Sequence, residues 1–339
     1  MTGGALHCDG LQPVILTPGD PAGVGAEISL MAFAAGMRGF ILMEEPDRLA
    51  GIASALNLSI EIKSVKAPEL LAQDHVFLPV MPLQWTERPV AGKSDSRNAD
   101  VIIASIRKAA AMAQDGSAAA IVTNPINKAI LKDAGFSHPG HTEFLASLAP
   151  ARPGAPLMML AGESLRVVPA TVHIALRDVP AALTTDGIVA KGRLLNEALQ
   201  LYFGCGSPRI AVCGLNPHAG ENGHFGDEDQ RLIAPAVEAL KDEGIGAFGP
   251  LSADTLFHPE ARQTYDAAIG MYHDQVLIPL KTIDFDGGVN VTLGLDFIRT
   301  SPDHGTAFDI AGTGKARPQS LMAAIRMARM MASRRHSDG

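Results

Sequence analysis

The length, composition and charge of the chain are those of a soluble α/β protein with two domains. It has 339 residues, of which 47% are apolar and 19% are charged, and its net charge is −8; a chain of this length usually exceeds one hydrophobic core. The acidic balance excludes a nucleic-acid or anionic-membrane surface, and no stretch reaches the ~20 apolar residues of a membrane span. The N-terminus lacks the apolar core of a signal peptide. We therefore expect a cytoplasmic protein without nucleic-acid or membrane partners.

Strands and helices alternate along the whole chain. This alternation predicts an α/β fold with mostly parallel, doubly wound sheets. In chain order, apolar runs and helical periodicity predict a strand at 13–16, a helix at 27–35, a strand at 40–43, a helix at 100–114, a strand at 118–123, a hairpin of strands at 156–161 and 166–174, a helix at 185–203, a strand at 209–215, a helix at 230–243, strands at 267–271 and 289–295, and a helix at 319–333.

Three histidines in the second half of the chain, His173, His218 and His273, each follow one of the apolar runs. A single histidine is more often a structural residue than a ligand. Three at the ends of strands, however, share the place where open α/β sheets bind ligands. Imidazole is the commonest protein ligand for zinc-like ions, and three protein ligands with one open position is the arrangement of catalytic zinc sites. The pattern predicts a divalent-metal site on these three residues.

A glycine-rich loop at residues 17–25 connects the first predicted strand to the first helix. Its three glycines, Gly19, Gly23 and Gly25, would let backbone N–H groups approach an anion at the helix N-terminus. The loop is not the Rossmann fingerprint, because prolines interrupt the glycines and no acidic strand end follows at the usual place. A purely structural tight turn explains the loop equally well.

A second glycine-rich segment at residues 303–316 precedes the last predicted helix. Small, flexible positions beside Asp303 and His304 suit a loop that wraps a nucleotide through backbone contacts, and an ordinary surface loop is the alternative. The blocks 18–27 and 304–312 together resemble two signatures of the isocitrate and isopropylmalate dehydrogenase-like superfamily. This resemblance implies a two-domain fold with a cleft between the domains. It also implies that the late loop binds NAD or NADP through His304, Gly305, Thr306, Asp309 and Gly312.

Further blocks narrow the resemblance to the 4-hydroxythreonine-4-phosphate dehydrogenase family. They follow one another in order, at compatible spacing, in a match that extends from about residue 11 to residue 334. The blocks are 123–128, 140–144, 216–221, 250–257, 271–275, 288–294 and 297–307. The resemblance implies one divalent ion per site, which would be zinc or alternatively magnesium or cobalt. It also implies a homodimer whose active site is completed by the partner subunit.

The resemblance assigns roles to individual residues. The metal ligands of the family fall on the same three histidines, and its substrate contacts fall on His141, Thr142, Lys281, Asn290 and Arg299. A phosphorylated amino acid presents several anionic oxygens, which an acidic protein must neutralise with local lysines and arginines. The structural alternatives are a helix cap for Thr142 and solvated surface positions for the basic residues. We expect residues 1–125 and 296–339 to form the nucleotide-side domain, and residues 126–295 the metal, substrate and dimerisation domain.

The implied reaction oxidises 4-phosphooxy-L-threonine to 2-amino-3-oxo-4-phosphooxybutanoate, which decarboxylates to 3-amino-2-oxopropyl phosphate in vitamin B6 biosynthesis. A divalent ion lowers the pKa of bound water from roughly 15.7 to about 7, and a coordinated hydroxyl should respond similarly. Hydride then passes to the nicotinamide, and the metal also stabilises the enolate formed by loss of CO₂. Three residues of the matched blocks are candidates for the group that takes the hydroxyl proton: Lys128, Asp254 and Asp274.

The chain departs from the family pattern at two places. Ala26 stands where proline is commoner, and Asp286-Gly287 stands where a basic residue is frequent, which removes a positive charge near the cleft. Two alternative functions remain open. One is a related metal- and NAD-dependent dehydrogenase for a phosphorylated sugar acid or a dihydrodiol carboxylate. The more distant one is a zinc hydrolase with a three-histidine site, in which the late glycine loop would have no role.

Overall fold

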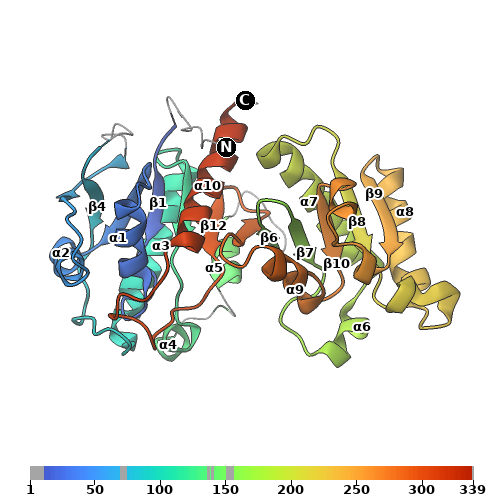
Figure 1. Cartoon of the computed structure of the whole chain (residues 1–339), viewed down its shortest axis with the longest axis horizontal. Coiled ribbons are helices and arrows are strands. Elements are labelled where there is room, and N and C mark those ends of the chain that lie inside the picture. Colours follow the sequence, from blue (N-terminus) through green and yellow to red (C-terminus); the bar gives the residue numbers. More distant parts are fainter. Residues whose placement is uncertain (1–10, 69–74, 136–137, 139–140, 150–155, 338–339) are drawn as a thin grey trace. The chain divides into compact units, whose positions relative to one another are not determined.

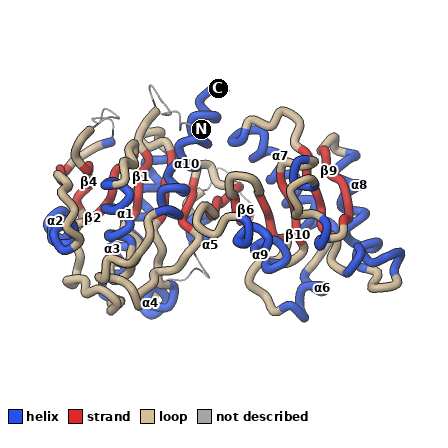
Figure 2. The backbone as a smooth tube through the Cα atoms, in the orientation of Figure 1, coloured by secondary structure: helices blue, strands red, loops and turns tan. Residues whose placement is uncertain are grey.

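A computed structural model describes the chain except for residues 1–10, 69–74, 136–137, 139–140, 150–155 and 338–339. The chain divides into two compact units, residues 1–154 with 295–339 and residues 155–294. Each unit is an α/β structure in which helices pack beside a central sheet (Figures 1 and 2). Within the described ranges, no helix combines the length and the apolar character that crossing a membrane requires.

The described sheet of the first unit is wholly parallel, in the order β3-β4-β2-β1-β5-β12. Its strands β1, β2 and β5 are buried along their whole length, as expected for parallel strands with both faces covered. The strands are β1 (Val14–Thr17), β2 (Phe40–Glu44), β3 (Ile62–Ser64), β4 (Leu78–Pro82), β5 (Ala120–Thr123) and β12 (Arg299–Pro302). The helices are α1 (Gly25–Ala34), α2 (Pro46–Ala55), α3 (Ala99–Gln114), α4 (Lys128–Asp133), α5 (His141–Ser147) and α10 (Gln319–Ser337).

The first unit extends further along the chain than the sequence suggested. Its first segment ends at residue 154 instead of residue 125, because α4 and α5 pack onto the core of this unit. Leu131 of α4 and Phe144 of α5 are buried in one apolar cluster with Ile15 of β1 and Ile121 of β5. The sequence offered no signal for this packing, since both helices are short and their apolar residues show no clear period.

The described sheet of the second unit is mixed, in the order β11-β6-β7-β10-β8-β9. The predicted hairpin is present, because β6 pairs with β7 in the antiparallel direction, and β6 also pairs antiparallel with β11. The strands β7, β10, β8 and β9 are parallel to one another. The strands are β6 (Leu157–Ala161), β7 (Arg166–Pro169), β8 (Arg209–Cys213), β9 (Gly246–Leu251), β10 (Ala267–Gly270) and β11 (Val289–Leu293). The helices are α6 (Val179–Ala182), α7 (Thr185–Phe203), α8 (Ala234–Asp242) and α9 (His273–Ile283).

Helix α7 shows how local sequence sets the limits of an element. The side chain of Thr184 caps its first turn by accepting a hydrogen bond from the Gly187 N–H at 3.0 Å. Gly204 ends the helix with φ +67°, a left-handed conformation that glycine adopts without a steric penalty. The predicted helix at 185–203 therefore has the observed bounds.

Two predicted elements have a different form. The strand expected at 166–174 ends at Pro169. The N–H groups of Ala170 and Thr171 still donate to the carbonyls of Gly270 and Met271, and the chain then bends at His173. The helix expected at 230–243 begins as a short π-helix at Asp229–Ile233 and becomes α-helical at Ala234. Such π-turns inside helices are frequent at functional sites.

Candidate functional site

The three strands that lead to the predicted metal histidines are neighbours in the second unit. Strand β10 lies between β7 and β8 and is parallel to both, with Gly270 opposite Pro169 and Ile269 opposite Val212. Parallel neighbours end at the same edge of a sheet, which is where ligands bind in open α/β folds. His173, His218 and His273 lie in the three segments that follow these ends.

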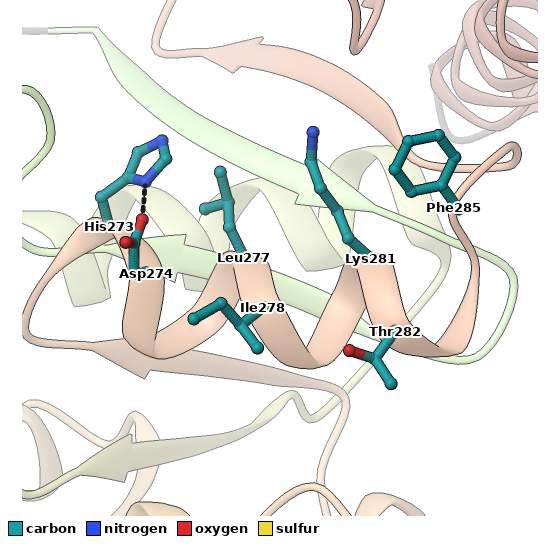
Figure 3. Close-up of a pocket in the computed structure, with 7 residues that line it drawn as sticks. All are labelled: His273, Asp274, Leu277, Ile278, Lys281, Thr282 and Phe285. Atoms are coloured by element: carbon teal, nitrogen blue, oxygen red, sulfur yellow. Dashed lines mark hydrogen bonds and ion pairs between the residues drawn. The ribbon is translucent and has the colours of Figure 1, made fainter.

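His173 and His273 lie next to each other at this edge. Their ring centroids are 5.7 Å apart. His273 is the first residue of α9, and its Nδ1 lies 2.7 Å from Oδ1 of Asp274 (Figure 3). Histidines that bind metals commonly have their second ring nitrogen bonded to a carboxylate, which fixes the orientation of the ring. This pairing leaves Nε2 of His273 as the nitrogen for a ligand.

His218 lies on an unusual turn. Six consecutive residues, from His218 to Gly223, have positive φ angles, and four of them are not glycine. Left-handed backbone costs a non-glycine residue about 1–2 kcal/mol, so the surrounding structure must hold the turn. Asp229 does so from a fully buried position, since its carboxylate accepts the N–H groups of Leu215 at 2.8 Å and Asn216 at 3.1 Å.

The donor set fits a zinc-like ion in chemistry, but its three members do not meet at one point. Among the described residues, no group of three or more histidine, cysteine, aspartate or glutamate side chains has the spacing of a metal site. His173 and His273 form the adjacent pair, while the His218 ring packs 6.1 Å from that of Phe225. For three histidines to bind one ion, the turn that carries His218 must therefore shift, or one of the three histidines must come from another chain.

Two of the three candidates for the proton acceptor lie beside these histidines. Asp274 contacts His273, as described above. Asp254 is fully exposed, and its pKa is lowered by a hydrogen bond from Ser252 and, to a lesser degree, by the charge of His218. The third candidate, Lys128, is an exposed residue at the start of α4 in the other unit.

Lys281 projects from α9 on the same side as His273 (Figure 3). The two residues are eight positions apart, which is about two helical turns, so their side chains share one face of the helix. Between them lies an open hollow of about 440 Å³ lined by His273, Asp274, Leu277, Ile278, Lys281, Thr282 and Phe285. This face combines a predicted metal ligand, an ammonium group and apolar side chains. Asn290, another predicted substrate contact, lies on β11 of the same unit.

Arg299 is buried in β12 of the first unit. It is 4% exposed, and its Nε and Nη2 donate to Oγ1 of Thr123 at 3.2 and 2.7 Å. Burial lowers the pKa of the guanidinium to about 10, because the charged form loses its hydration. The group therefore still carries its charge at neutral pH. The last two predicted substrate contacts, His141 and Thr142, begin α5, and their side chains lie outside the described part of the structure.

The two glycine-rich loops of the first unit lie against each other. They follow β1 and β12, which both pair with β5 in a parallel sheet, so their ends lie at one edge. The Val24 N–H donates to the Thr306 carbonyl at 3.1 Å, and Glu27 accepts the Gly312 N–H at 2.9 Å. The late loop leaves His304, Gly305 and Asp309 exposed, and a Cβ atom at Gly305 would meet nothing within 4 Å. An exposed backbone with open space beside it fits a nucleotide.

Sequence reasoning missed several residues that support these sites. Glu27 and Thr123 stood inside matched blocks without an assigned role, and Asp229 stood outside them. Their positions in the sequence carry no signal, because each acts on backbone or side chains that are distant in the chain.

Comparison with known proteins identifies the family and the fold of this chain. The family model described as "Pyridoxal phosphate biosynthetic protein PdxA" matches residues 38–328. A protein of Xanthobacter autotrophicus named 4-hydroxythreonine-4-phosphate dehydrogenase is 51% identical over 94% of this chain and 93% of its own length. The crystal structure of the Klebsiella pneumoniae protein of that name has a TM-score of 0.89 at 38% identity and covers 96% of this chain and 99% of its own.

A more distant structure shows how far the fold extends. A terephthalate 1,2-cis-dihydrodiol dehydrogenase from Burkholderia xenovorans has a TM-score of 0.64 at 28% identity and covers 94% of this chain and 98% of its own. The dehydrogenase fold predicted from the sequence is thus confirmed. With a family model that matches most of its length and relatives near 50% identity, this chain belongs to the PdxA family of pyridoxal phosphate biosynthetic proteins.

Proposed function

We propose that this protein oxidises 4-hydroxythreonine 4-phosphate with NAD or NADP and a divalent metal ion, and that decarboxylation of the product gives 3-amino-2-oxopropyl phosphate for pyridoxal phosphate biosynthesis. The observation that carries the proposal is the set of three histidines after three adjacent parallel strands, in a chain of the PdxA family. Family membership and relatives named as dehydrogenases argue against the zinc-hydrolase alternative. The dihydrodiol alternative is less favoured, because that relative is only 28% identical.

His173, His218 and His273 would hold the metal, and the loop at 303–316 would hold the nucleotide. When bound, a divalent ion supplies the charge that acidifies the substrate hydroxyl, and a nicotinamide accepts the hydride. The remaining work falls to side chains of this chain. Asp274 orients the His273 ring, and Asp254, Asp274 or Lys128 takes the hydroxyl proton. Lys281, Arg299 and Asn290 would bind the anionic and polar groups of the substrate, together with His141 and Thr142.

A direct assay tests this function. Purified protein is mixed with 4-phosphooxy-L-threonine and NAD, or NADP, and NADH or NADPH formation is followed before and after treatment with a chelator. We expect turnover that the chelator removes and that zinc, cobalt or magnesium restores. Turnover of a dihydrodiol carboxylate but not of the phosphorylated substrate would instead support the alternative dehydrogenase. Turnover that survives complete removal of metal would contradict the metal assignment.

We also propose that the active protein is a homodimer in which the partner subunit completes the site. Large apolar side chains are exposed close to the histidines: Ile174 and Leu176 follow His173 at 44% and 67% exposure, and Ile278 on α9 is 61% exposed. Phe285, at the end of the same hollow, is 70% exposed. Exposed apolar surface of this kind marks interfaces. A second copy of the chain would bury this surface and would also cover the exposed rings of His173 and His218.

Mixing inactive variants measures whether the histidines are shared between subunits. The alanine variants of His173, His218 and His273 are combined in the three possible pairs, and activity is measured after subunit exchange. If two ligands come from one chain and the third from its partner, two of the three pairs regain one intact site per mixed dimer. Random exchange then restores about a quarter of wild-type activity in those pairs. Each variant alone, treated in the same way, is the control. No recovery in any pair after confirmed exchange would place the whole site in one subunit.

A further inference from the structure

Glu27 links the two glycine-rich loops of the first unit. It lies in the first turn of α1 and is 4% exposed. Its Oε2 accepts the N–H of Gly312 at 2.9 Å, and its Oε1 accepts the N–H of Gly314 at 3.1 Å. Both carboxylate oxygens thus bind the backbone of a loop that is 285 residues distant in the sequence.

The first glycine-rich loop also holds the late loop near its beginning, at Thr306. The Thr306 carbonyl accepts the Val24 N–H at 3.1 Å, and a Cβ atom at Gly23 would lie 2.8 Å from that carbonyl oxygen. The backbone between the hydrogen bonds at Thr306 and at Gly312 includes Asp309, which is exposed. The first glycine loop and α1 therefore hold the late loop at Thr306 and at Gly312–Gly314, whereas a Cβ atom at Gly305 would meet nothing within 4 Å.

Accepting the N–H groups of both Gly312 and Gly314 requires a carboxylate. Gly312 and Gly314 have φ angles of +78° and +70°, a left-handed conformation that glycine adopts without a steric penalty, and both donate their N–H groups to the Glu27 carboxylate. An ionised carboxylate has acceptor oxygens for both N–H groups, whereas glutamine has one oxygen and would place an NH₂ group against the other N–H. Hydrogen bonds to a charged group also contribute more to stability than neutral ones.

We propose that Glu27 is a positioning residue for the cofactor, which sets the loop at 303–316 in the conformation that receives the nucleotide before it binds. A loop that is already ordered loses less conformational entropy on binding, and this increases affinity. The inference rests on the proposed function, because it takes this loop as the nucleotide site. It adds a residue that does not itself contact the nucleotide.

The test measures NAD binding to the metal-free protein by calorimetry. Glu27→Gln changes the side chain by one atom, and we expect the Kd for NAD to rise by about tenfold, as for the loss of one charge-assisted hydrogen bond. In steady-state assays the loss should fall on the KM for NAD, with the KM for the phosphorylated substrate and zinc affinity unchanged. Glu27→Asp keeps the charge on a shorter side chain and should show a smaller rise.

Two further variants separate the possible outcomes. Asp229→Asn is the matched control, because Asp229 is also buried and accepts two backbone N–H groups, but in the second unit; its Kd for NAD should stay at the wild-type value. Gly305→Val places a β-branched side chain in the open space of the loop and should weaken NAD binding directly. Thermal unfolding of each variant checks that it is folded.

The outcomes distinguish failure of this inference from failure of the function. Wild-type NAD affinity in folded Glu27→Gln and Glu27→Asp proteins, with weakened binding in Gly305→Val, would reject the role of Glu27 and keep the loop as the cofactor site. Unchanged affinity in all three loop variants would remove the loop from the cofactor site and overturn the inference. A wild-type protein that binds neither NAD nor NADP would overturn the proposed function itself. Equal losses of NAD and zinc affinity in Glu27→Gln would show a general structural role.

Discussion

Alanine at His173, His218 or His273 is expected to reduce turnover to background and to lower metal affinity by more than about 100-fold, the upper end of the effect of losing a neighbour of a metal ligand. The fold should remain, because a catalytic metal site contributes less to folding than a closed structural site with four protein ligands. The exposed edge at which the histidines lie supports this expectation, since replacing exposed rings opens no cavity at His173 or His218.

Two other variants calibrate the result. Asp274→Asn retains the size of the side chain but weakens its hydrogen bond to His273 Nδ1, and we expect a loss of metal affinity of roughly 10- to 100-fold. His258→Ala removes an exposed histidine of the same unit that accepts a hydrogen bond from the Ala261 N–H, and it should behave as the wild type. Metal content by mass spectrometry and binding by titration are the measurements. Near-normal metal content and activity in all three ligand variants would contradict the metal site.

Arg299→Ala is expected to lower kcat/KM for the phosphorylated substrate by about 2–5 kcal/mol, or roughly 30- to 4,000-fold, the range for breaking a buried charge pair. Arg299 is buried and its pKa is near 10, so the guanidinium is charged in the neutral range and becomes neutral only as the pH rises through that value. The difference between wild type and variant should therefore be constant around neutral pH and shrink above about pH 10. An anionic substrate oxygen would compensate the hydration that the buried charge has lost.

The buried position of Arg299 makes a stability control necessary. Arg329 is a second buried arginine of the first unit, which donates to the Gly39 carbonyl at 3.0 Å, so Arg329→Ala reports the cost of removing a buried guanidinium without a predicted substrate contact. Kinetics with a dephosphorylated substrate complete the test. With this substrate, kcat/KM should differ much less between the wild type and Arg299→Ala than it does with the phosphorylated substrate. Equal damage with both substrates, or equal damage in Arg329→Ala, would assign Arg299 to structure instead.

The fold class and the family were predictable from the sequence, and both predictions are confirmed. The apolar run at 118–123 and the helical period at 100–114 predicted elements close to β5 and α3. A fully buried strand appears in the sequence as a continuous apolar run, and an amphipathic helix appears as apolar residues at helical spacing. Strand β12 left no such trace. Its residues are Arg-Thr-Ser-Pro, and it is a strand because β5 pairs with its backbone.

The sequence by itself determined which residues are candidates for the chemistry, since three histidines after apolar runs and two glycine-rich loops are local patterns. Only the tertiary structure decided how they are arranged. The strand order makes β7, β10 and β8 neighbours, which places His173 beside His273 and leaves His218 on a separate turn held by Asp229. The structure also joins Glu27 to a loop at the far end of the chain and buries Arg299 against Thr123. These contacts link residues distant in sequence, and no local pattern records them, because strand pairing and helix packing depend on the whole chain at once.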